Sequence, residues 1–278
     1  MNLPQQPGPI GVFDSGYGGL TILRELRALL PQYDYLYLGD NARAPYGTRS
    51  FDVVYRYTQQ AVTTLFSRGC HLVILACNTA SAKALRTIQL NDLPTLDPAR
   101  RVLGVIRPTA EIVGQITTSR HVGILATTGT VMSHSYDMEI RKLFPDITVS
   151  SQDCPMWVPL VENFEFDSAG ADYFVKLRID QILEKDPKID TLVLACTHYP
   201  MLINKIRLHT PANVKIISQG EYVAHSLRQY LANHPEIDAK ITLGGTLHCL
   251  TTENTDKFDA TAIHYLHSDV HAENIILS

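Results

Sequence analysis

The chain has 278 residues, of which 45% are apolar and 19% are charged, so it can bury a full core and form two domains. Its net charge of −4, with no basic stripe, argues against nucleic acid or an anionic membrane as a partner. Apolar runs reach only about six residues, far short of the roughly 20 that span a bilayer.

The N-terminus and the cysteines indicate a cellular location. Residues 1–9 lack the basic start and apolar core of a signal peptide, so we expect a disordered lead-in and a cytoplasmic protein. The five cysteines are odd in number and widely spaced, which disfavours a disulfide framework and fits a reducing compartment. No Cys or His spacing predicts a metal site. We expect Cys70 and Cys249 to be ordinary small apolar residues.

Strand and helix signals alternate along the chain, which predicts an α/β fold with mainly parallel sheets flanked by helices. Short apolar runs predict the strands, and apolar residues three or four apart predict the helices. The first elements expected are a strand at Ile10–Phe13, a helix from Leu20 to Leu30, a strand at Tyr35–Leu38, a helix from Val54 to Leu65 that Gly69 ends, a strand at Leu72–Ala76 and a helix at Ser81–Ile88.

The same alternation restarts near residue 101 and continues to the C-terminus. Proline and glycine mark several of the boundaries between these elements. The elements expected are strands at Val102–Ile106, Val122–Leu125, Leu192–Ala195, from Val214 and near Thr246–Leu250, and helices at Ala110–Ile116, Val131–Phe144, Ala169–Leu183, Tyr222–Leu231 and Lys257–Leu266.

Two predicted strands end in the same way. Residues 72–79 read LVILACNT and residues 192–198 read LVLACTH, so each apolar run delivers a cysteine to a polar loop. Residues 10–16 and 122–128 form a second matching pair at nearly the same offset. Two matches in the same order predict two similar α/β domains. Ligands of such sheets bind beyond the carboxyl ends of the strands, so we expect both thiols there, before helices, with the active site in the cleft between the domains.

Two thiols in similar places suggest a reaction that uses the same group twice. A free thiol has a pKa of about 8.5, so its ionisation at pH 7 costs roughly 2 kcal/mol, which a helix N-terminus or a hydrogen bond can offset. One thiolate can remove a proton from one face of a carbon. The other thiol can then protonate the opposite face, which inverts the configuration.

The loop residues indicate an amino acid as the substrate. Residues 14–19 (DSGYGG) and 78–81 (NTAS) offer backbone N–H groups and hydroxyls that suit carboxylates. Asp14 is itself negative and suits an ammonium group. A zwitterionic amino acid meets both requirements.

Five motifs resemble those of bacterial glutamate racemase and follow the order of that family. They are residues 14–19 (DSGYGG), 45–47 (PYG), 76–80 (ACNTA), 159–162 (PLVE) and 195–200 (ACTHYP). The resemblance covers nearly the whole chain from Ile10. It implies a cofactor-independent proton transfer at Cα that interconverts L- and D-glutamate and supplies D-glutamate for peptidoglycan. It also implies a homodimer.

The resemblance further implies roles for individual residues. Cys77 would act on the D-enantiomer, with Asp14 as its auxiliary group. Cys196 would act on the L-enantiomer, with His198 beside it and Glu162 as a further candidate near His198. The residues that would contact the amino acid are Asp14, Ser15, Pro45, Tyr46, Gly47, Asn78, Thr79, Thr130 and Thr197, with Thr127 and Thr128 offering hydroxyls in the same loop as Thr130.

The family completes its first domain with the C-terminal segment of the chain. By this resemblance we expect a first domain of residues 1–106 plus 218–278 and a second domain of residues 107–217. Each domain would carry one of the two thiols. One departure from the family pattern is the connection 90–101, which is longer than the usual link.

Three alternatives remain open. An aspartate racemase, or another two-cysteine racemase of the family, would differ in the depth of its cleft. A cysteine hydrolase could use Cys196 as nucleophile and His198 as base, because residues two apart on an extended strand point the same way. A non-enzymatic amino-acid sensor, or an inhibitor of DNA gyrase, which the resemblance also allows, would bind without proton exchange at Cα.

Overall fold

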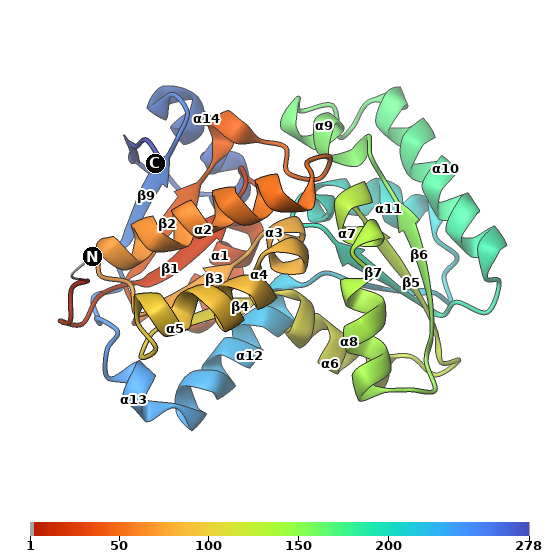
Figure 1. Cartoon of the computed structure of the whole chain (residues 1–278). Helices are drawn as coiled ribbons and strands as arrows, with labels where there is room; N and C mark the ends of the chain where they lie inside the picture. The colour runs from red at the N-terminus through yellow and green to blue at the C-terminus, as the bar shows by residue number, and fades with distance from the viewer. Residues whose placement is uncertain (1–2, 278) are drawn as a thin grey trace. The chain divides into compact units, whose positions relative to one another are not determined.

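The computed structural model describes residues 3–277 and separates the chain into two compact units (Figure 1). The first unit extends to Val105 and takes in the chain again from Gly220, and the second unit is Ile106–Gln219. Each unit contains one sheet of parallel strands flanked by helices, which confirms the predicted fold class.

The first unit contains a six-stranded sheet in the order β10-β9-β2-β1-β3-β4. Every neighbouring pair of these strands is parallel, so all their carboxyl ends lie along one edge. The strands are β1 (Ile10–Asp14), β2 (Tyr35–Gly39), β3 (Leu72–Leu75), β4 (Arg101–Gly104), β9 (Leu247–Thr251) and β10 (Ala272–Asn274).

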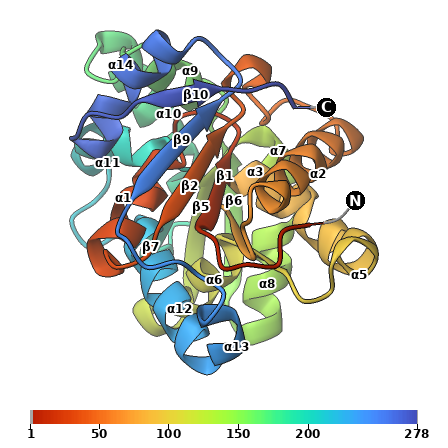
Figure 2. The ribbon, with the colours of Figure 1, turned by 90° about the vertical axis from the view of Figure 1, so that its left-hand side faces the viewer.

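Helices cover both faces of this first sheet (Figure 2). On one face, α2 buries Val54, Ala61 and Leu65 against the strands, and α3 packs beside it. On the other face lie α1 and α14, and α12 packs on α1. The long helices of this unit are α1 (Leu20–Leu29), α2 (Phe51–Ser67), α12 (Gly220–Asn233) and α14 (Thr255–Leu266). The short ones are η1 (Asn41–Arg43), α3 (Asn78–Lys83), α4 (Leu85–Thr87), η2 (Ile88–Asp92), α5 (Leu93–Leu96) and α13 (Pro235–Asp238).

The second unit contains a four-stranded parallel sheet in the order β6-β5-β7-β8. Its strands are β5 (His121–Ala126), β6 (Thr148–Asp153), β7 (Thr191–Ala195) and β8 (Lys215–Ile217). Its helices are α6 (Ile106–Ile116), α7 (Thr128–Met132), α8 (Ser135–Leu143), α9 (Trp157–Glu162), α10 (Ala169–Lys185), η3 (Tyr199–Leu202) and α11 (Ile203–His209). Within residues 3–277, no helix combines the length and the apolar character that a membrane crossing requires.

The internal repeat predicted from the sequence is confirmed by strand order and register. The order β2-β1-β3-β4 in the first unit corresponds to β6-β5-β7-β8 in the second. Gly11 of β1 is paired with Val73 of β3, and Gly123 of β5 is paired with Leu192 of β7. These are the positions that the two sequence matches align, so the two cysteines follow corresponding strands in the same register.

Some predicted boundaries are wrong because local backbone geometry overrides the apolar spacing. The single helix expected at Val131–Phe144 is two helices, α7 and α8, because His134 adopts a left-handed backbone conformation with φ of 54°. The strand expected at Val102–Ile106 ends at Gly104, and α6 begins at Ile106. By contrast Gly69, with φ of +94°, ends α2 as predicted.

Other differences lie in polar or irregular segments. The edge strands β6 and β10 were not predicted, because TVSSQD and AEN contain no apolar run. The helix expected at Ser81–Ile88 divides into α3 and α4. The long connection 90–101 is largely helical, since the end of the π-helical turn η2 and the whole of α5 lie within it.

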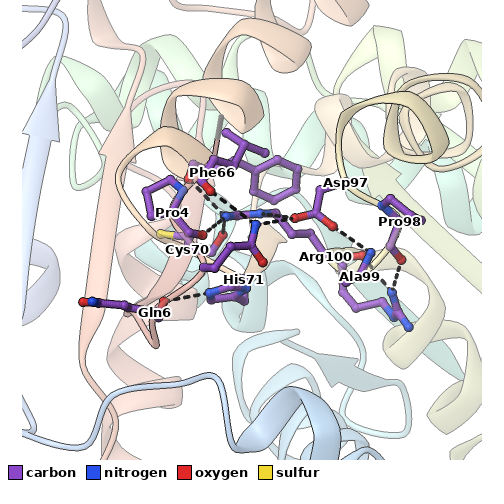
Figure 3. Close-up of polar contacts among 12 residues, drawn as sticks. Pro4, Gln6, Phe66, Cys70, His71, Asp97, Pro98, Ala99 and Arg100 are labelled. Atoms are coloured by element: carbon purple, nitrogen blue, oxygen red, sulfur yellow. Dashed lines mark hydrogen bonds and ion pairs between the residues drawn. The ribbon is translucent and has the colours of Figure 1, made fainter. Parts of the chain in front are cut away.

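A buried arginine fastens the N-terminal segment to the first unit (Figure 3). Arg100 is fully buried, and its guanidinium donates to the backbone oxygens of Pro4, Phe66 and Cys70 and pairs with Asp97 at 3.2 Å. The disordered lead-in expected at residues 1–9 is therefore wrong for residues 3–9, while residues 1 and 2 lie outside the described part of the chain.

Neighbouring contacts hold the same N-terminal segment further along. His71 Nε2 donates to the backbone oxygen of Gln6 at 2.8 Å. The backbone of Gly8 exchanges hydrogen bonds of 3.0 Å with Lys240 and Thr242. The contacts of Arg100, His71 and Gly8, here called the Arg100 clamp, therefore join the N-terminal segment to the segments that enter β3, β4 and β9.

We expect Arg100→Lys to lower the free energy of unfolding by about 2–4 kcal/mol, because a single ammonium cannot replace a planar fork that serves three carbonyls. The measurement is the urea unfolding midpoint. Arg141→Lys, at an arginine whose side chain is 64% exposed, is the matched control and should change little. Equal midpoints for the two variants would contradict the assignment of a clamp to Arg100.

Candidate active site

The predicted site residues of the first unit follow three neighbouring strands, β2, β1 and β3, at their carboxyl ends. Because the strands are parallel, the loops that carry these residues leave the sheet at one edge. They are Asp14 and Ser15 at the end of β1, Pro45, Tyr46 and Gly47 beyond β2, and Cys77, Asn78 and Thr79 beyond β3.

Cys77 lies at the start of a helix, as predicted. Its sulfur caps α3 and accepts the backbone N–H of Ala80 at 3.4 Å. The hydroxyl of Ser15 lies 3.4 Å from the same sulfur. Only 5% of Cys77 is exposed, so the Ala80 N–H and the Ser15 hydroxyl are polar groups that lie against the sulfur in place of water.

Asp14 is the last residue of β1 and is fully buried. Its carboxylate accepts the backbone N–H of Gly16 at 2.8 Å, which makes a local turn. A Cβ on Gly19 would lie 2.4 Å from Cβ of Asp14, so only glycine allows α1 to begin this close to the carboxylate. Gly19 therefore lets the start of α1 pack directly against Asp14.

A buried carboxylate that the sequence analysis missed organises the loop after β2. Asp40 is fully buried and accepts hydrogen bonds from the hydroxyl of Tyr46, from Nε of Arg43 at 2.7 Å and from Oγ1 of Thr252 at 2.9 Å. Burial is the larger cause and the charge of Asp40 the second cause that raise the pKa of Tyr46. The Tyr46 hydroxyl therefore remains a hydrogen-bond donor. The available signal was an acid directly after β2, one position beyond Gly39, which the register pairs with Asp14.

The predicted residues of the second unit also follow the carboxyl ends of three neighbouring strands, β6, β5 and β7. Thr130 lies in α7 beyond β5, and Glu162 ends α9 beyond β6. Cys196, Thr197 and His198 follow β7 and are all nearly buried. The 3₁₀ turn η3, rather than an α-helix, comes after Cys196, which differs from the expectation of a helix start there.

Cys196 shares a chain of polar contacts with two other predicted residues. Its sulfur lies 3.9 Å from Nδ1 of His198, and Nε2 of His198 lies 3.1 Å from Oε1 of Glu162. Burial by itself lowers the pKa of His198, but the hydrogen bonds and charges of Cys196 and Glu162 outweigh burial and raise this pKa well above its ordinary value. The contacts with Cys196 and Glu162 therefore favour the protonated form of the His198 ring.

The structure distinguishes the three hydroxyls after β5. Thr127 caps α7, its oxygen accepting the backbone N–H of Thr130 at 3.3 Å. The side chain of Thr128 instead donates to Asp153 at 3.0 Å. Thr130 is 2% exposed and lies 3.1 Å, oxygen to oxygen, from the Thr127 hydroxyl. Thr127 and Thr130 therefore form one polar pair, and Thr128 belongs to another.

The other three cysteines are also buried. Burial raises the pKa of Cys70 to about 12 and that of Cys249 to about 12, and it raises the pKa of Cys154 well above its ordinary value. This confirms the expectation that Cys70 and Cys249 are packing residues. All five cysteines are free, and among residues 3–277 no three His, Cys, Asp or Glu side chains gather into a group that could hold a metal ion.

Residues 20–227 match the family described as Asp/Glu/Hydantoin racemase, which is well over half of the chain. The chain belongs to this family. A glutamate racemase of Ruegeria sp. is 37% identical over 94% of this chain and 97% of its own length. The family resemblance predicted from the motifs is thus confirmed.

Solved structures of the racemase family have the same fold. The glutamate racemase isoform RacE1 of Bacillus anthracis superposes with a TM-score of 0.88 at 33% identity, covering 97% of this chain and 98% of that one. The glutamate racemase of Francisella tularensis, solved in complex with D-glutamate, superposes with a TM-score of 0.86 at 30% identity, covering 98% of both chains.

We expect Glu162→Gln to lower the pKa of His198. The neutral amide removes the negative charge that stabilises the protonated ring, so the proton is lost at lower pH. The measurement is an NMR titration of the His198 imidazole. Glu165→Gln changes the net charge equally at an exposed acid nearby and should leave the His198 titration unchanged. An unshifted titration in Glu162→Gln would refute the pairing.

Proposed function

We propose that the protein is a glutamate racemase that moves a proton at Cα with two thiols and no cofactor. The observation that carries this proposal is the pair Cys77 and Cys196. Each thiol is nearly buried, follows the corresponding strand of one of two similar sheets, and has its own hydrogen-bonding partners. The family membership of the chain supports the same reaction class.

The proposed reaction is balanced by the two sulfurs alone. The thiolate of one cysteine takes the α-proton, which breaks the C–H bond, forms an S–H bond and leaves the electron pair on Cα. The thiol of the other cysteine gives its proton to the opposite face of Cα, forming the new C–H bond and leaving a thiolate. The product has the opposite configuration, and the two sulfurs have exchanged protonation states.

The finer assignments follow from the family resemblance and from the local contacts. Cys77 removes the proton from D-glutamate, with Ser15 and Ala80 stabilising its anion and Asp14 as the auxiliary acid–base group. Cys196 removes the proton from L-glutamate. His198, paired with Glu162, adjusts the protonation of the Cys196 sulfur. Each half of the reaction therefore has a different source of charge stabilisation.

We propose glutamate as the substrate because the relatives named above are glutamate racemases and one of them was solved with D-glutamate. Backbone and hydroxyl donors in the loops suit its carboxylates. The residues proposed to contact it are Asp14, Ser15, Pro45, Tyr46, Gly47, Asn78, Thr79, Thr130 and Thr197. In the cell we propose a cytoplasmic homodimer that supplies D-glutamate to peptidoglycan.

A cysteine hydrolase is the second candidate, because Cys196, His198 and Glu162 are arranged as a nucleophile, a base and an orienting acid. This alternative assigns no role to Cys77 or to the repeated scaffold. It predicts an acyl-thioester on Cys196 that mass spectrometry would detect after incubation with an ester or amide substrate. The racemase proposal predicts no such adduct.

We expect the protein to incorporate deuterium at Cα of either glutamate enantiomer in deuterium oxide, with loss of optical activity. Replacing one thiol by a poor acid and base should lower kcat/KM by about 10²–10⁴-fold in Cys77→Ser and in Cys196→Ser. NMR and polarimetry measure exchange and racemisation together. Cys249→Ser, at a buried packing cysteine, is the control and should retain activity. Full activity in either motif variant would refute the two-thiol mechanism.

We also expect kcat/KM to be higher for glutamate than for aspartate. A site shaped for the longer side chain loses contacts and misplaces Cα when a methylene is missing, which is worth about 10- to 200-fold. Racemisation of the two amino acids by one preparation, followed by polarimetry, makes the comparison. A preference for aspartate would identify the chain as a racemase of the same family with a different substrate.

A further inference from the structure

Tyr37 contacts the loop that follows Asp14 in the first unit, although it belongs to none of the sequence motifs. It lies in the middle of β2, is fully buried, and its hydroxyl donates to the backbone oxygen of Gly16 at 2.8 Å. The register pairs Tyr37 with Val12 of β1, two residues before Asp14. The tyrosine ring therefore reaches along the sheet to the loop that follows β1.

The hydrogen bond from Tyr37 to Gly16 lies next to the two polar side chains of residues 14–16, Asp14 and Ser15. The N–H of Gly16 donates to Asp14 at 2.8 Å, while the neighbouring Ser15 hydroxyl lies 3.4 Å from the sulfur of Cys77. Glycine restricts its own backbone least of all residues, so its conformation here has to be fixed from outside. The Tyr37 hydroxyl supplies such a constraint on the carbonyl side of Gly16.

The Tyr37 side chain is itself held firmly. Its ring packs against Phe258 of α14, with ring centroids 6.1 Å apart. Burial, followed by the nearby charge of Asp14, raises the pKa of its hydroxyl well above the ordinary value. The group therefore remains a protonated hydrogen-bond donor across the working pH range.

The corresponding position of the second unit holds a different residue. Ile124 of β5 corresponds to Val12, and its partner on β6 is Ser151 rather than a tyrosine. There the loop after β5 is held by its own cap, in which Thr127 accepts the N–H of Thr130. The tyrosine hydroxyl at this position is thus a feature of the Cys77 unit.

We propose that Tyr37 is a positioning residue for the Cys77 half of the reaction, acting through Gly16 on Asp14 and Ser15. This inference rests on the proposed racemase function. Loss of the hydroxyl frees the carbonyl of Gly16, loosens the loop and slows the proton transfers at Cys77. The transfers at Cys196, in the other unit, keep their own supporting groups.

The chain provides a matched control on the same strand. Tyr35 lies two residues before Tyr37 on β2, so both rings point to the same face of the sheet. Tyr35 is also fully buried, and its hydroxyl donates to backbone oxygens of Leu30 at 3.0 Å and Leu26 at 3.3 Å. These acceptors lie at the far end of α1, away from the Asp14–Gly16 loop.

The experiment compares Tyr37→Phe and Tyr35→Phe with the wild type, using D- and L-glutamate deuterated at Cα. We expect Tyr37→Phe to lower kcat/KM about tenfold. The isotope effect on kcat/KM should rise for D-glutamate, because proton removal by Cys77 becomes more rate-limiting. The isotope effect should fall for L-glutamate. In that direction Cys196 breaks the bond to deuterium, and the later protonation of Cα by Cys77 becomes the limiting step. Tyr35→Phe should leave both isotope effects at their wild-type values.

Each result bears on the proposal. Opposite changes of the two isotope effects in Tyr37→Phe alone support it, whereas unchanged effects, or equal changes in both variants, overturn it. Should Tyr37→Phe fail to fold, 3-fluorotyrosine at position 37 keeps the hydroxyl and changes its donor strength. Isotope effects that match those of 3-fluorotyrosine at position 35 then overturn the proposal. A wild type without Cα exchange instead refutes the racemase function itself.

Discussion

The dominant constraint on this protein is that its two motif thiols lie where little water reaches them. Cys77 and Cys196 are only 5% and 6% exposed, and burial favours the neutral thiol, as the raised pKa values of Cys70 and Cys249 show. Any thiolate at the two motif positions therefore depends on groups supplied by the fold. The carboxyl ends of parallel strands suit this purpose, since loops and helix starts there present backbone N–H groups.

The two units meet the same constraint in different ways. In the first, the start of α3 and the Ser15 hydroxyl supply neutral donors to the sulfur of Cys77, and the acid Asp14 lies at the end of the neighbouring strand. In the second, the position that corresponds to Asp14 is Ala126, and the charge comes instead from His198 and Glu162. Strand order and register are thus shared, while the polar groups around each thiol are specific to its unit. A reaction between mirror-image substrates requires two bases, and it does not require them to be supported identically.

The sequence analysis was most accurate where burial controls the amino-acid pattern. Central strands such as β3 and β7 are continuous apolar runs, whereas the edge strand β6 is polar and was missed. The motif cysteines and their loops could be found because each follows a buried strand. The contact of Asp40 with Thr252 could not be predicted, since the two residues are distant in the sequence and only the fold brings them together. The contact between Tyr37 and Gly16 could not be predicted either. A tyrosine whose hydroxyl bonds to a distant loop cannot be distinguished in a sequence from one that only packs.

In each sheet the stabilising contacts lie at the amino ends of the strands. The residues proposed for the chemistry lie at the carboxyl ends. In the first unit the Arg100 clamp binds the segments that enter β3 and β4, at their amino ends. In the second unit Asp190, just before β7, accepts hydrogen bonds from Thr117, Thr118 and Ser119, which lead into β5. These contacts fix the strands without using any residue at their carboxyl ends. The loops at the carboxyl ends can therefore contain small, polar and glycine residues that stabilise a fold poorly and suit a substrate well. The separation also explains why the two units can share one scaffold and still differ in the groups that contact each thiol.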